Sequence, residues 1–200
     1  MNKRQALIER KTNEVDISGS LTIDGEGKQN IKTPYDSLNH MLSEFAFHGF
    51  FDLDLKAKGD LSHHIVEDIG IALGNAFRQA VGDTFSIRRF GTGSVPMEEI
   101  LVDVSVDICG RPKLVSDPAP INEDNLDLKK GAFFDFLDKF VNNAKITLHI
   151  RIPHDPAGKG TDSHHYFEAL FKALAIALDS ASTIDERRKG IPSTKGVIDL

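Results

Sequence analysis

The chain has 200 residues, of which 40% are hydrophobic and 27% are charged, and its formal net charge is −6. This length suffices for one substantial domain or two small ones, and the acidic balance argues against nucleic acid as a partner. No apolar run is long enough to cross a membrane and the N-terminus lacks the apolar core of a signal peptide, so we expect a cytoplasmic protein.

The first half of the chain predicts a strand pair, a helix, a further strand and a second helix. Residues 6–23 alternate apolar and polar around Asn13-Glu14, as paired strands do. After Pro34, apolar residues at helical spacing predict a helix whose buried face carries Leu38, Met41, Leu42 and Phe45. Residues 51–57 alternate again, and residues 63–81 predict a helix with Ser62 as its N-cap.

The second half repeats this order. Residues 99–108 predict a strand that ends at the only cysteine, Cys109, which excludes an intrachain disulfide and is expected to be a buried structural thiol. Residues 111–125 contain three prolines and predict a loop. A helix is predicted next, with an apolar face of Phe133, Phe134, Leu137, Phe140 and Val141. A strand over 145–152, a loop over 153–162 and a helix over 164–178 follow it.

The repeated order predicts an internally duplicated α+β fold. A period near 100 residues is too long for a solenoid and indicates two copies of one domain. We therefore expect a first half over residues 1–92 and a second over residues 93–200. Each half should form a β-sheet that two helices cover on one face.

A five-residue pattern of two adjacent histidines followed by a glutamate occurs once in each half, as His63-His64-Ile65-Val66-Glu67 and His164-His165-Tyr166-Phe167-Glu168. On a helix, residues four apart share a face, whereas an adjacent residue points about 100° away. Each motif therefore divides its ligands between two metal ions. Pairing the halves predicts one site from His64, His164 and Glu168 and another from His63, Glu67 and His165, with ligands that suit Mn, Fe, Co or Zn.

Other polar residues give weaker signals. His40 lies beside the apolar face of the first predicted helix and, taken alone, is a core or boundary histidine. Basic residues gather at three places in an acidic chain, which favours a small anionic ligand, although each residue alone also fits a solvated surface. These residues are Arg88 and Arg89, then Arg111 and Lys113, then Arg187, Arg188, Lys189 and Lys195.

Four segments, at residues 39–49, 89–91, 160–172 and 192–196, resemble motifs of imidazoleglycerol-phosphate dehydratase of histidine biosynthesis, and the likeness extends over nearly the whole chain. The stretch from Gly160 to Lys172, GTDSHHYFEALFK, is similar to the family's second signature throughout. Asn39-His40-Met41-Leu42 with His48-Gly49 resembles its first-helix motif. Arg89 followed by Phe90-Gly91, and Pro192-Ser193-Thr194-Lys195-Gly196, also match. The family's fold implies two halves of the ribosomal protein S5 domain 2-like type.

The resemblance implies a hydro-lyase that converts D-erythro-imidazoleglycerol phosphate to imidazole acetol phosphate and water. It also implies two Mn²⁺ ions per site and a homo-oligomer of twenty-four subunits with sites at subunit contacts. It adds His40 to the ligands His64, His164 and Glu168 of the first metal and assigns acid/base catalysis to Glu14. The positions that match substrate contacts, mainly to phosphate, are Glu14, His40, His48, Arg89, Arg111, Lys172, Ser193, Thr194 and Lys195.

The chain departs from the family in three places. The family's third helix has a histidine before Phe-Phe that completes the second metal site, and here Ala132 precedes Phe133-Phe134. The loop before His63 is shorter than usual. The loop before His164 is longer and carries His154 and Asp155, one of which is a candidate replacement ligand.

Two alternatives to this enzyme remain open from the sequence. One is a divergent paralogue that acts on a related phosphorylated imidazole. The other is an inactive, metal-assembled structural protein. Glu14, Arg89, Arg111, Lys172 and Lys195 argue against the structural protein, because a structural metal cage needs no phosphate-binding groups.

Overall fold

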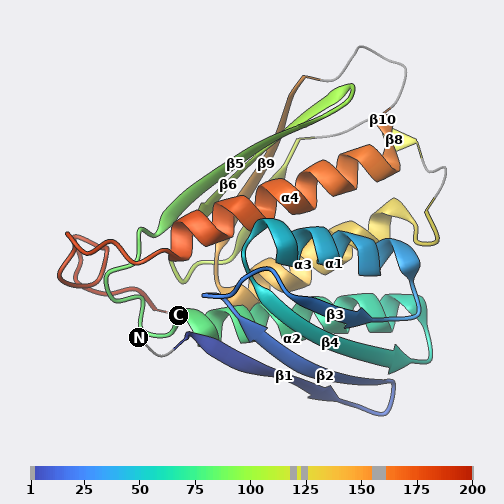
Figure 1. Cartoon of the computed structure of the whole chain (residues 1–200), viewed down its shortest axis with the longest axis horizontal. Helices are drawn as coiled ribbons and strands as arrows, with labels where there is room; N and C mark the ends of the chain where they lie inside the picture. Colours follow the sequence, from blue (N-terminus) through green and yellow to red (C-terminus); the bar gives the residue numbers. More distant parts are fainter. Residues whose placement is uncertain (1–2, 118–120, 123–125, 155–160, 200) are drawn as a thin grey trace.

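Two four-stranded sheets enclose four helices in the computed structural model, which describes residues 3–117, 121–122, 126–154 and 161–199 (Figure 1). Each sheet is covered on its inner face by the two helices of its own half, so the layers run sheet, helices, helices, sheet. The predicted α+β class is confirmed. No helix in the described part of the chain is long and apolar enough to cross a membrane.

The first half forms a sheet in the order β1-β2-β4-β3, in which β3 is parallel to β4 and the other neighbours are antiparallel. The predicted strand pair around Asn13-Glu14, the two helices and the strand between them are confirmed. The elements are β1 Gln5–Lys11, β2 Val15–Thr22, β3 Gln29–Lys32, α1 Asp36–His48, β4 Asp52–Gly59 and α2 Ser62–Val81.

The second half repeats the topology, with a sheet in the order β5-β6-β9-β7 and β7 parallel to β9. The short strands β8 and β10 form a separate parallel pair. This agreement confirms the predicted duplication. The elements are β5 Phe90–Met97, β6 Ile100–Asp107, β7 Lys113–Ser116, β8 Ile121–Asn122, α3 Lys130–Ala144, β9 Thr147–His154, β10 Thr161–Asp162 and α4 Ser163–Ser182.

The division of the chain into two halves remains our proposal for its domains. A boundary between residues 92 and 93 falls inside β5, which pairs with β6 from Phe90 to Met97. A boundary before Phe90 would keep the second sheet whole.

The two halves meet through their helices, because α1 packs on α4 and α2 packs on α3. The ring of Phe140 from α3 lies 6.3 Å from Phe45 of α1 and 6.1 Å from Phe77 of α2, and all three side chains are buried. Burying such aromatic side chains is among the largest favourable contributions to folding. Side chains from opposite halves therefore face each other along two helix pairs.

Two glycines of β5 set how closely the strand lies against α4. A Cβ atom at Gly91 would lie 1.9 Å from the carbonyl oxygen of Ala177, and one at Gly93 would lie 2.1 Å from that of Ala173. Any larger residue would push the strand away from the helix. The position of α4, which begins with the second histidine motif, thus depends on this contact.

Several predictions of detail were wrong. The structure adds β3 and β5, and the loop predicted over residues 111–125 contains β7, a short edge strand between prolines. The predicted loop over 153–162 begins with the end of β9 and closes with β10. Ser62 is the first residue of α2 rather than its N-cap; Leu61 takes the cap position without a side-chain bond.

The predicted apolar faces of α1 and α3 are confirmed, except that Phe136 takes the place of Phe134 in the buried face of α3. Leu38, Met41, Leu42 and Phe45 of α1 are all buried. On α3, Phe134 is only half-buried, and Phe136 packs in the core instead.

Candidate metal centre and anion pocket

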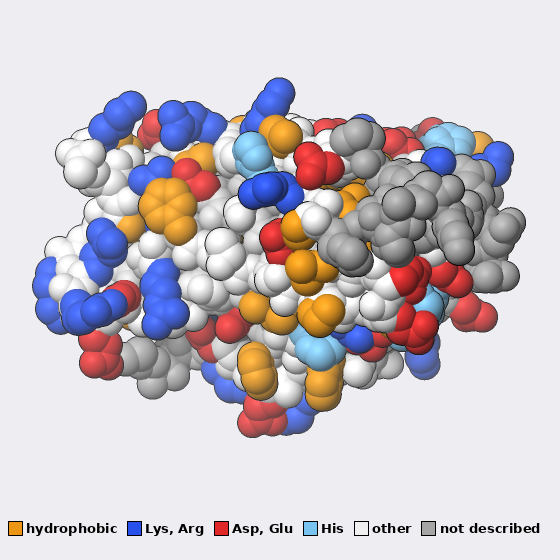
Figure 2. Space-filling view, turned by 90° about the horizontal axis from the view of Figure 1, so that it is seen from above, with side chains coloured by type: hydrophobic (Ala, Val, Ile, Leu, Met, Phe, Trp, Pro, Cys, Tyr) orange, Lys and Arg blue, Asp and Glu red, His pale blue; other side chains and the backbone are white. Residues whose placement is uncertain are grey.

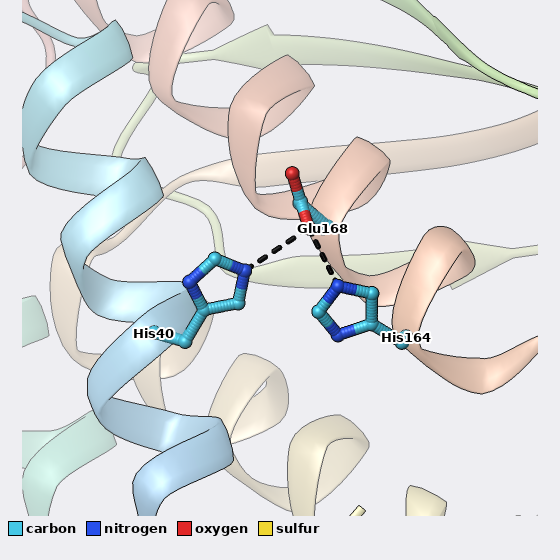
Figure 3. Close-up of side chains that lie close together, drawn as sticks. All are labelled: His40, His164 and Glu168. Atoms are coloured by element: carbon cyan, nitrogen blue, oxygen red, sulfur yellow. Dashed lines mark hydrogen bonds and ion pairs between the residues drawn. The ribbon is translucent and has the colours of Figure 1, made fainter. Parts of the chain in front are cut away.

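Three potential metal ligands converge where α1 meets α4. Nε2 of His40 lies 3.0 Å from Oε2 of Glu168, and Nε2 of His164 lies 2.9 Å from the same oxygen (Figure 3). One ligand atom from each of the three residues lies within 4.8 Å of the others. His164 and Glu168 share a face of α4 because they are four residues apart. The cluster therefore joins a residue of the first half to the motif of the second.

Lys172 and Glu44 lie beside the three ligands and hold the side chain of Glu168 in place. Nζ of Lys172, one turn further along α4, lies 2.5 Å from Oε1 of Glu168 and 3.2 Å from Oε2 of Glu44. Burial raises the pKa of the Glu168 carboxyl, but the hydrogen bonds from Lys172 and His40 outweigh it, and the net pKa is lowered. Glu168 is thus held as a carboxylate with one oxygen facing two imidazoles, which is what a metal ion requires.

His64 lies in a different cluster of the same chain. Its Nδ1 donates to Oδ1 of Asp60 at 2.8 Å and lies 3.8 Å from Oε2 of Glu14. The hydrogen bond to Asp60 raises the pKa of His64. Within the described residues of one chain, His64 does not join His40, His164 and Glu168 as a three-ligand group. It is instead beside Glu14, the predicted acid/base residue.

His165 is held by two glutamates from the turn between β5 and β6. Its Nδ1 lies 3.0 Å from Oε2 of Glu99, and its Nε2 lies 3.9 Å from Oε1 of Glu98. Burial lowers the pKa of His165, but the bond to Glu99 and nearby carboxylates outweigh it, and the net pKa is raised. A carboxylate on one ring nitrogen orients a histidine so that the other nitrogen can bind a metal. Glu99 could not be predicted from the sequence, because its contact with His165 depends on tertiary packing.

His63 and Glu67, the remaining members of the first motif, lie at the start of α2. Oε2 of Glu67 is 3.4 Å from Nζ of Lys139 on α3, and the ring of His63 is 4.2 Å from that of His64. Ala132 lies in the first turn of α3 and packs against the core. Asp155 and the side chain of His154 are outside the described residues, so their suggested role as replacement ligands stays a hypothesis.

A pocket near the C-terminus gathers most of the predicted phosphate contacts. Arg89, Arg111, Ser193, Thr194 and Lys195 line a cavity of about 350 Å³. Arg89 reaches both oxygens of Asp107, at 2.7 and 3.0 Å, and also donates to the carbonyl of Pro192 at 3.0 Å. Arg89 therefore attaches the C-terminal segment to β6 while leaving guanidinium donors for a ligand.

Cys109 lies beside this pocket and is buried, as predicted for a structural thiol. Its Sγ is 3.4 Å from Oγ1 of Thr147. His48, another predicted substrate contact, lies instead on α1, where its Nε2 is 3.2 Å from Oε2 of Glu44.

The metal ligands and the anion pocket lie at opposite ends of α4. The backbone N–H of Arg89 bonds to the carbonyl of Ala181 in the last turn, whereas His164 is in the first turn. Ala181 lies 17 positions after His164 on the same helix, which corresponds to a distance of about 25 Å along the helix axis. Figure 2 shows Lys and Arg side chains gathered at the left end, where Figure 1 places residues 183–199. No small substrate could reach both places on one chain.

Comparison with known proteins gives a single family over most of the chain. A family model described as imidazoleglycerol-phosphate dehydratase matches residues 33–178. The protein of that name from Thermoanaerobacter pseudethanolicus is 51% identical to this chain, and the match covers 98% of this chain and all of that protein. The one from Bacillus pumilus is 47% identical at the same coverage.

Solved structures agree with this result. The crystal structure of the dehydratase from Pyrococcus furiosus has a TM-score of 0.81 at 36% identity, over 94% of this chain and 99% of that chain. The structure from Staphylococcus aureus has a TM-score of 0.79 at 34% identity, over 90% of this chain and 99% of that chain.

Proposed function

Because the chain belongs to the imidazoleglycerol-phosphate dehydratase family of hydro-lyases, we propose that it converts D-erythro-imidazoleglycerol phosphate to imidazole acetol phosphate in histidine biosynthesis. We further propose that the reaction depends on Mn²⁺ and takes place in the cytoplasm. The observation that carries the metal dependence is the convergence of His40, His164 and Glu168 on one point. The pocket that Arg89, Arg111 and Lys195 line supports a phosphorylated substrate and argues against a purely structural role.

The donor set fits Mn²⁺. Two imidazole nitrogens and one carboxylate oxygen are acceptable ligands for Mn²⁺. A bound metal ion would supply Lewis acidity at the imidazole of the substrate. His40, His164 and Glu168 would hold it, and Lys172 would neutralise the remaining oxygen of Glu168.

Glu14 would move protons during loss of the hydroxyl group. Its side chain is 55% exposed and lies in the turn between β1 and β2, next to His64. An exposed carboxylate beside a metal-binding histidine is within reach of a bound substrate without being a ligand itself. Arg89, Arg111, Ser193, Thr194 and Lys195 would bind the phosphate and so orient the reacting carbons.

The separation of the two ends of α4 supports an assembly whose sites lie between subunits. The His40 cluster and the anion pocket of one chain are too far apart for a substrate of one ring, three carbons and a phosphate. His64 and Glu14 also stand apart from the His40 cluster. We therefore propose a homo-oligomer, of twenty-four subunits by analogy with the family, in which neighbouring chains complete each site.

Shared sites predict that two inactive variants restore each other. Glu168→Gln removes a metal ligand, and Lys195→Glu reverses a charge in the anion pocket, so each homogeneous protein should turn over substrate very slowly. When the two variants are co-expressed and co-assembled, roughly a quarter of the sites should be intact by random mixing. Steady-state turnover of the mixed assembly measures this. Activity no higher than that of the separate variants would mean that each chain contains its whole site.

The proposed reaction itself is tested by incubating the purified protein with imidazoleglycerol phosphate and Mn²⁺. Formation of imidazole acetol phosphate is expected. Absence of product with Mn²⁺, Fe²⁺, Co²⁺ and Zn²⁺ alike would contradict the proposed function.

A further inference from the structure

Two adjacent strands of the second sheet each supply a side chain that bonds to one arginine of the anion pocket. Asp107 of β6 and Thr147 of β9 are direct partners in the register of the sheet. Asp107 bonds to the side chain of Arg89, and Thr147 bonds to the main chain of Arg111. Neither is among the described residues that line the pocket. Both arginines are therefore attached to one cross-strand pair.

Asp107 fixes the direction of the Arg89 guanidinium. Nε of Arg89 donates to Oδ1 of Asp107 at 2.7 Å, and Nη2 donates to Oδ2 at 3.0 Å. Nη1 donates to the carbonyl of Pro192 at 3.0 Å. Within the described residues these bonds use three of the five N–H donors of the guanidinium, which leaves two for an anion. The side chains of Arg89 and Asp107 are only 16% and 22% exposed, so water competes weakly for their charge-assisted bonds.

The backbone of Arg89 is held at both of its polar groups. Its φ angle of 77° lies in the left-handed region, which residues other than glycine rarely adopt. Its N–H donates to the carbonyl of Ala181 in the last turn of α4 at 2.8 Å, and its carbonyl accepts from the N–H of Ile108 at 3.0 Å. The freedom that remains to Arg89 is the rotation of its side chain, which Asp107 limits.

Thr147 holds the segment that carries Arg111. Its Oγ1 donates to the carbonyl of Arg111 at 2.9 Å. The N–H of Gly110 donates to the carbonyl of Lys145 at 2.9 Å, just before β9 begins. The hydroxyl of Thr147 therefore adds a side-chain bond at the residue that lines the pocket.

We infer that Asp107 and Thr147 are positioning residues for phosphate binding: Asp107 orients the guanidinium of Arg89, and Thr147 places Arg111 relative to it. The inference rests on the proposed function, in which this pocket binds the phosphate of the substrate. A guanidinium binds a phosphate through two parallel N–H···O bonds only when both donors point at the same group, so its direction sets the strength of binding. Asp107 should contribute more than Thr147, because hydrogen bonds between charged groups are the stronger ones.

The direction of the expected effect separates positioning from charge. The carboxylate of Asp107 repels a phosphate in the pocket, so the loss of its charge alone would strengthen phosphate binding. The amide of Asp107→Asn offers Arg89 one acceptor atom in place of two, so one of the two bonds between these side chains is lost. Weaker phosphate binding in Asp107→Asn therefore cannot come from the change of charge.

The test measures the binding of two separate probes to the assembled, Mn²⁺-loaded protein by titration calorimetry. Inorganic phosphate carries the group that the pocket would hold, and imidazole carries the ring without the phosphate. The variants are Asp107→Asn and Thr147→Val, and kcat and KM for imidazoleglycerol phosphate are measured on the same samples. Circular dichroism and light-scattering mass check that each variant folds and assembles.

Asp103→Asn is the matched control. Asp103 lies four residues before Asp107 on β6 and hence on the same face of the sheet. Its carboxylate accepts a bond from Oγ of Ser94 at 2.6 Å and is not among the described residues that contact the arginines of the pocket. The substitution removes the same charge from the same strand and leaves Arg89 in place.

We expect Asp107→Asn to bind inorganic phosphate roughly 10-fold more weakly or worse, and Thr147→Val a few-fold more weakly. KM should rise more than kcat falls in both variants. Imidazole binding should stay at the wild-type value in every variant, and Asp103→Asn should match the wild type for both probes.

Unchanged or tighter phosphate binding in Asp107→Asn would overturn the inference, as would an equal loss for imidazole or an equal loss in Asp103→Asn. Unchanged phosphate binding in Thr147→Val would remove Thr147 from it. A wild type that binds no phosphate also overturns it. A wild type that binds phosphate and forms no product contradicts the proposed reaction alone, and the phosphate affinities of the variants still decide the positioning roles.

Discussion

Glutamine at position 168 is expected to remove the first Mn²⁺ and to lower turnover roughly 10³-fold or more. Oε2 of Glu168 lies 3.0 Å from Nε2 of His40 and 2.9 Å from Nε2 of His164. A neutral amide cannot replace a carboxylate in binding a divalent cation. Lewis-acid assistance is worth several kcal/mol, and about 4 kcal/mol corresponds to this loss in rate. Bound Mn²⁺ per chain and steady-state turnover are measured on the same samples.

Glu44→Gln is the control for this prediction. Both glutamates bond to Lys172, at 3.2 Å for Glu44 and 2.5 Å for Glu168, so both substitutions remove one of its partners. Only Glu168 belongs to the three-ligand group. Glu44→Gln should therefore keep its full content of Mn²⁺. If Glu168→Gln also kept it, the cluster in Figure 3 would be a hydrogen-bonded network rather than a metal site.

The second large effect is expected from Glu14→Gln, which should reduce kcat by roughly 10²- to 10⁴-fold, the usual contribution of a general acid or base. Because Glu14 stands 3.8 Å from Nδ1 of His64 and does not belong to the group of His40, His164 and Glu168, bound Mn²⁺ should not change. The combination of lost turnover and retained metal distinguishes proton transfer from metal binding. Turnover and Mn²⁺ content of the purified variant measure the two effects.

A nearby carboxylate separates this role from a general effect of charge. Asp16 lies two residues after Glu14 and approaches Lys58 at 3.5 Å and Lys11 at 4.0 Å, both on the surface. Asp16→Asn should retain turnover close to the wild type, since surface ion pairs contribute little. Equal losses in Glu14→Gln and Asp16→Asn would exclude a specific role for Glu14 in proton transfer.

Local patterns were sufficient for the helices and for the ligands that share a helix. The apolar spacing of Leu38, Met41, Leu42 and Phe45 depends only on the period of the helix, and these side chains are buried as predicted. The pairing of His164 with Glu168 depends on the same geometry over four residues. Such features need no knowledge of the tertiary structure.

Edge strands and contacts between distant segments could not be predicted in this way. β3 is four residues long, mostly exposed, and has no apolar alternation to mark it. β5 is interrupted by Gly91 and Gly93, which look like loop residues until α4 is known to pack on them. The partners Asp107 for Arg89 and Glu99 for His165 also arise from chain pairing at long range.

The helices α1 and α3 show why the register of an internal repeat is hard to predict from the sequence alone. The sequence contains a conspicuous Phe133-Phe134 pair, and the residue before it, Ala132, has no donor. Burial places Phe136 and Leu137 where α1 has Met41 and Leu42. The register of the two helices therefore follows from burial rather than from the aromatic pair in the sequence.

Turnover measured against bound metal tests the central claim most directly. The purified protein is stripped of metal with a chelator, confirmed to retain its fold and mass, and then titrated with Mn²⁺ in the presence of imidazoleglycerol phosphate. We predict no turnover in the stripped protein and recovery of imidazole acetol phosphate formation in proportion to bound Mn²⁺. Full turnover by the metal-free protein, or no turnover after Mn²⁺ is restored, would contradict the proposed reaction.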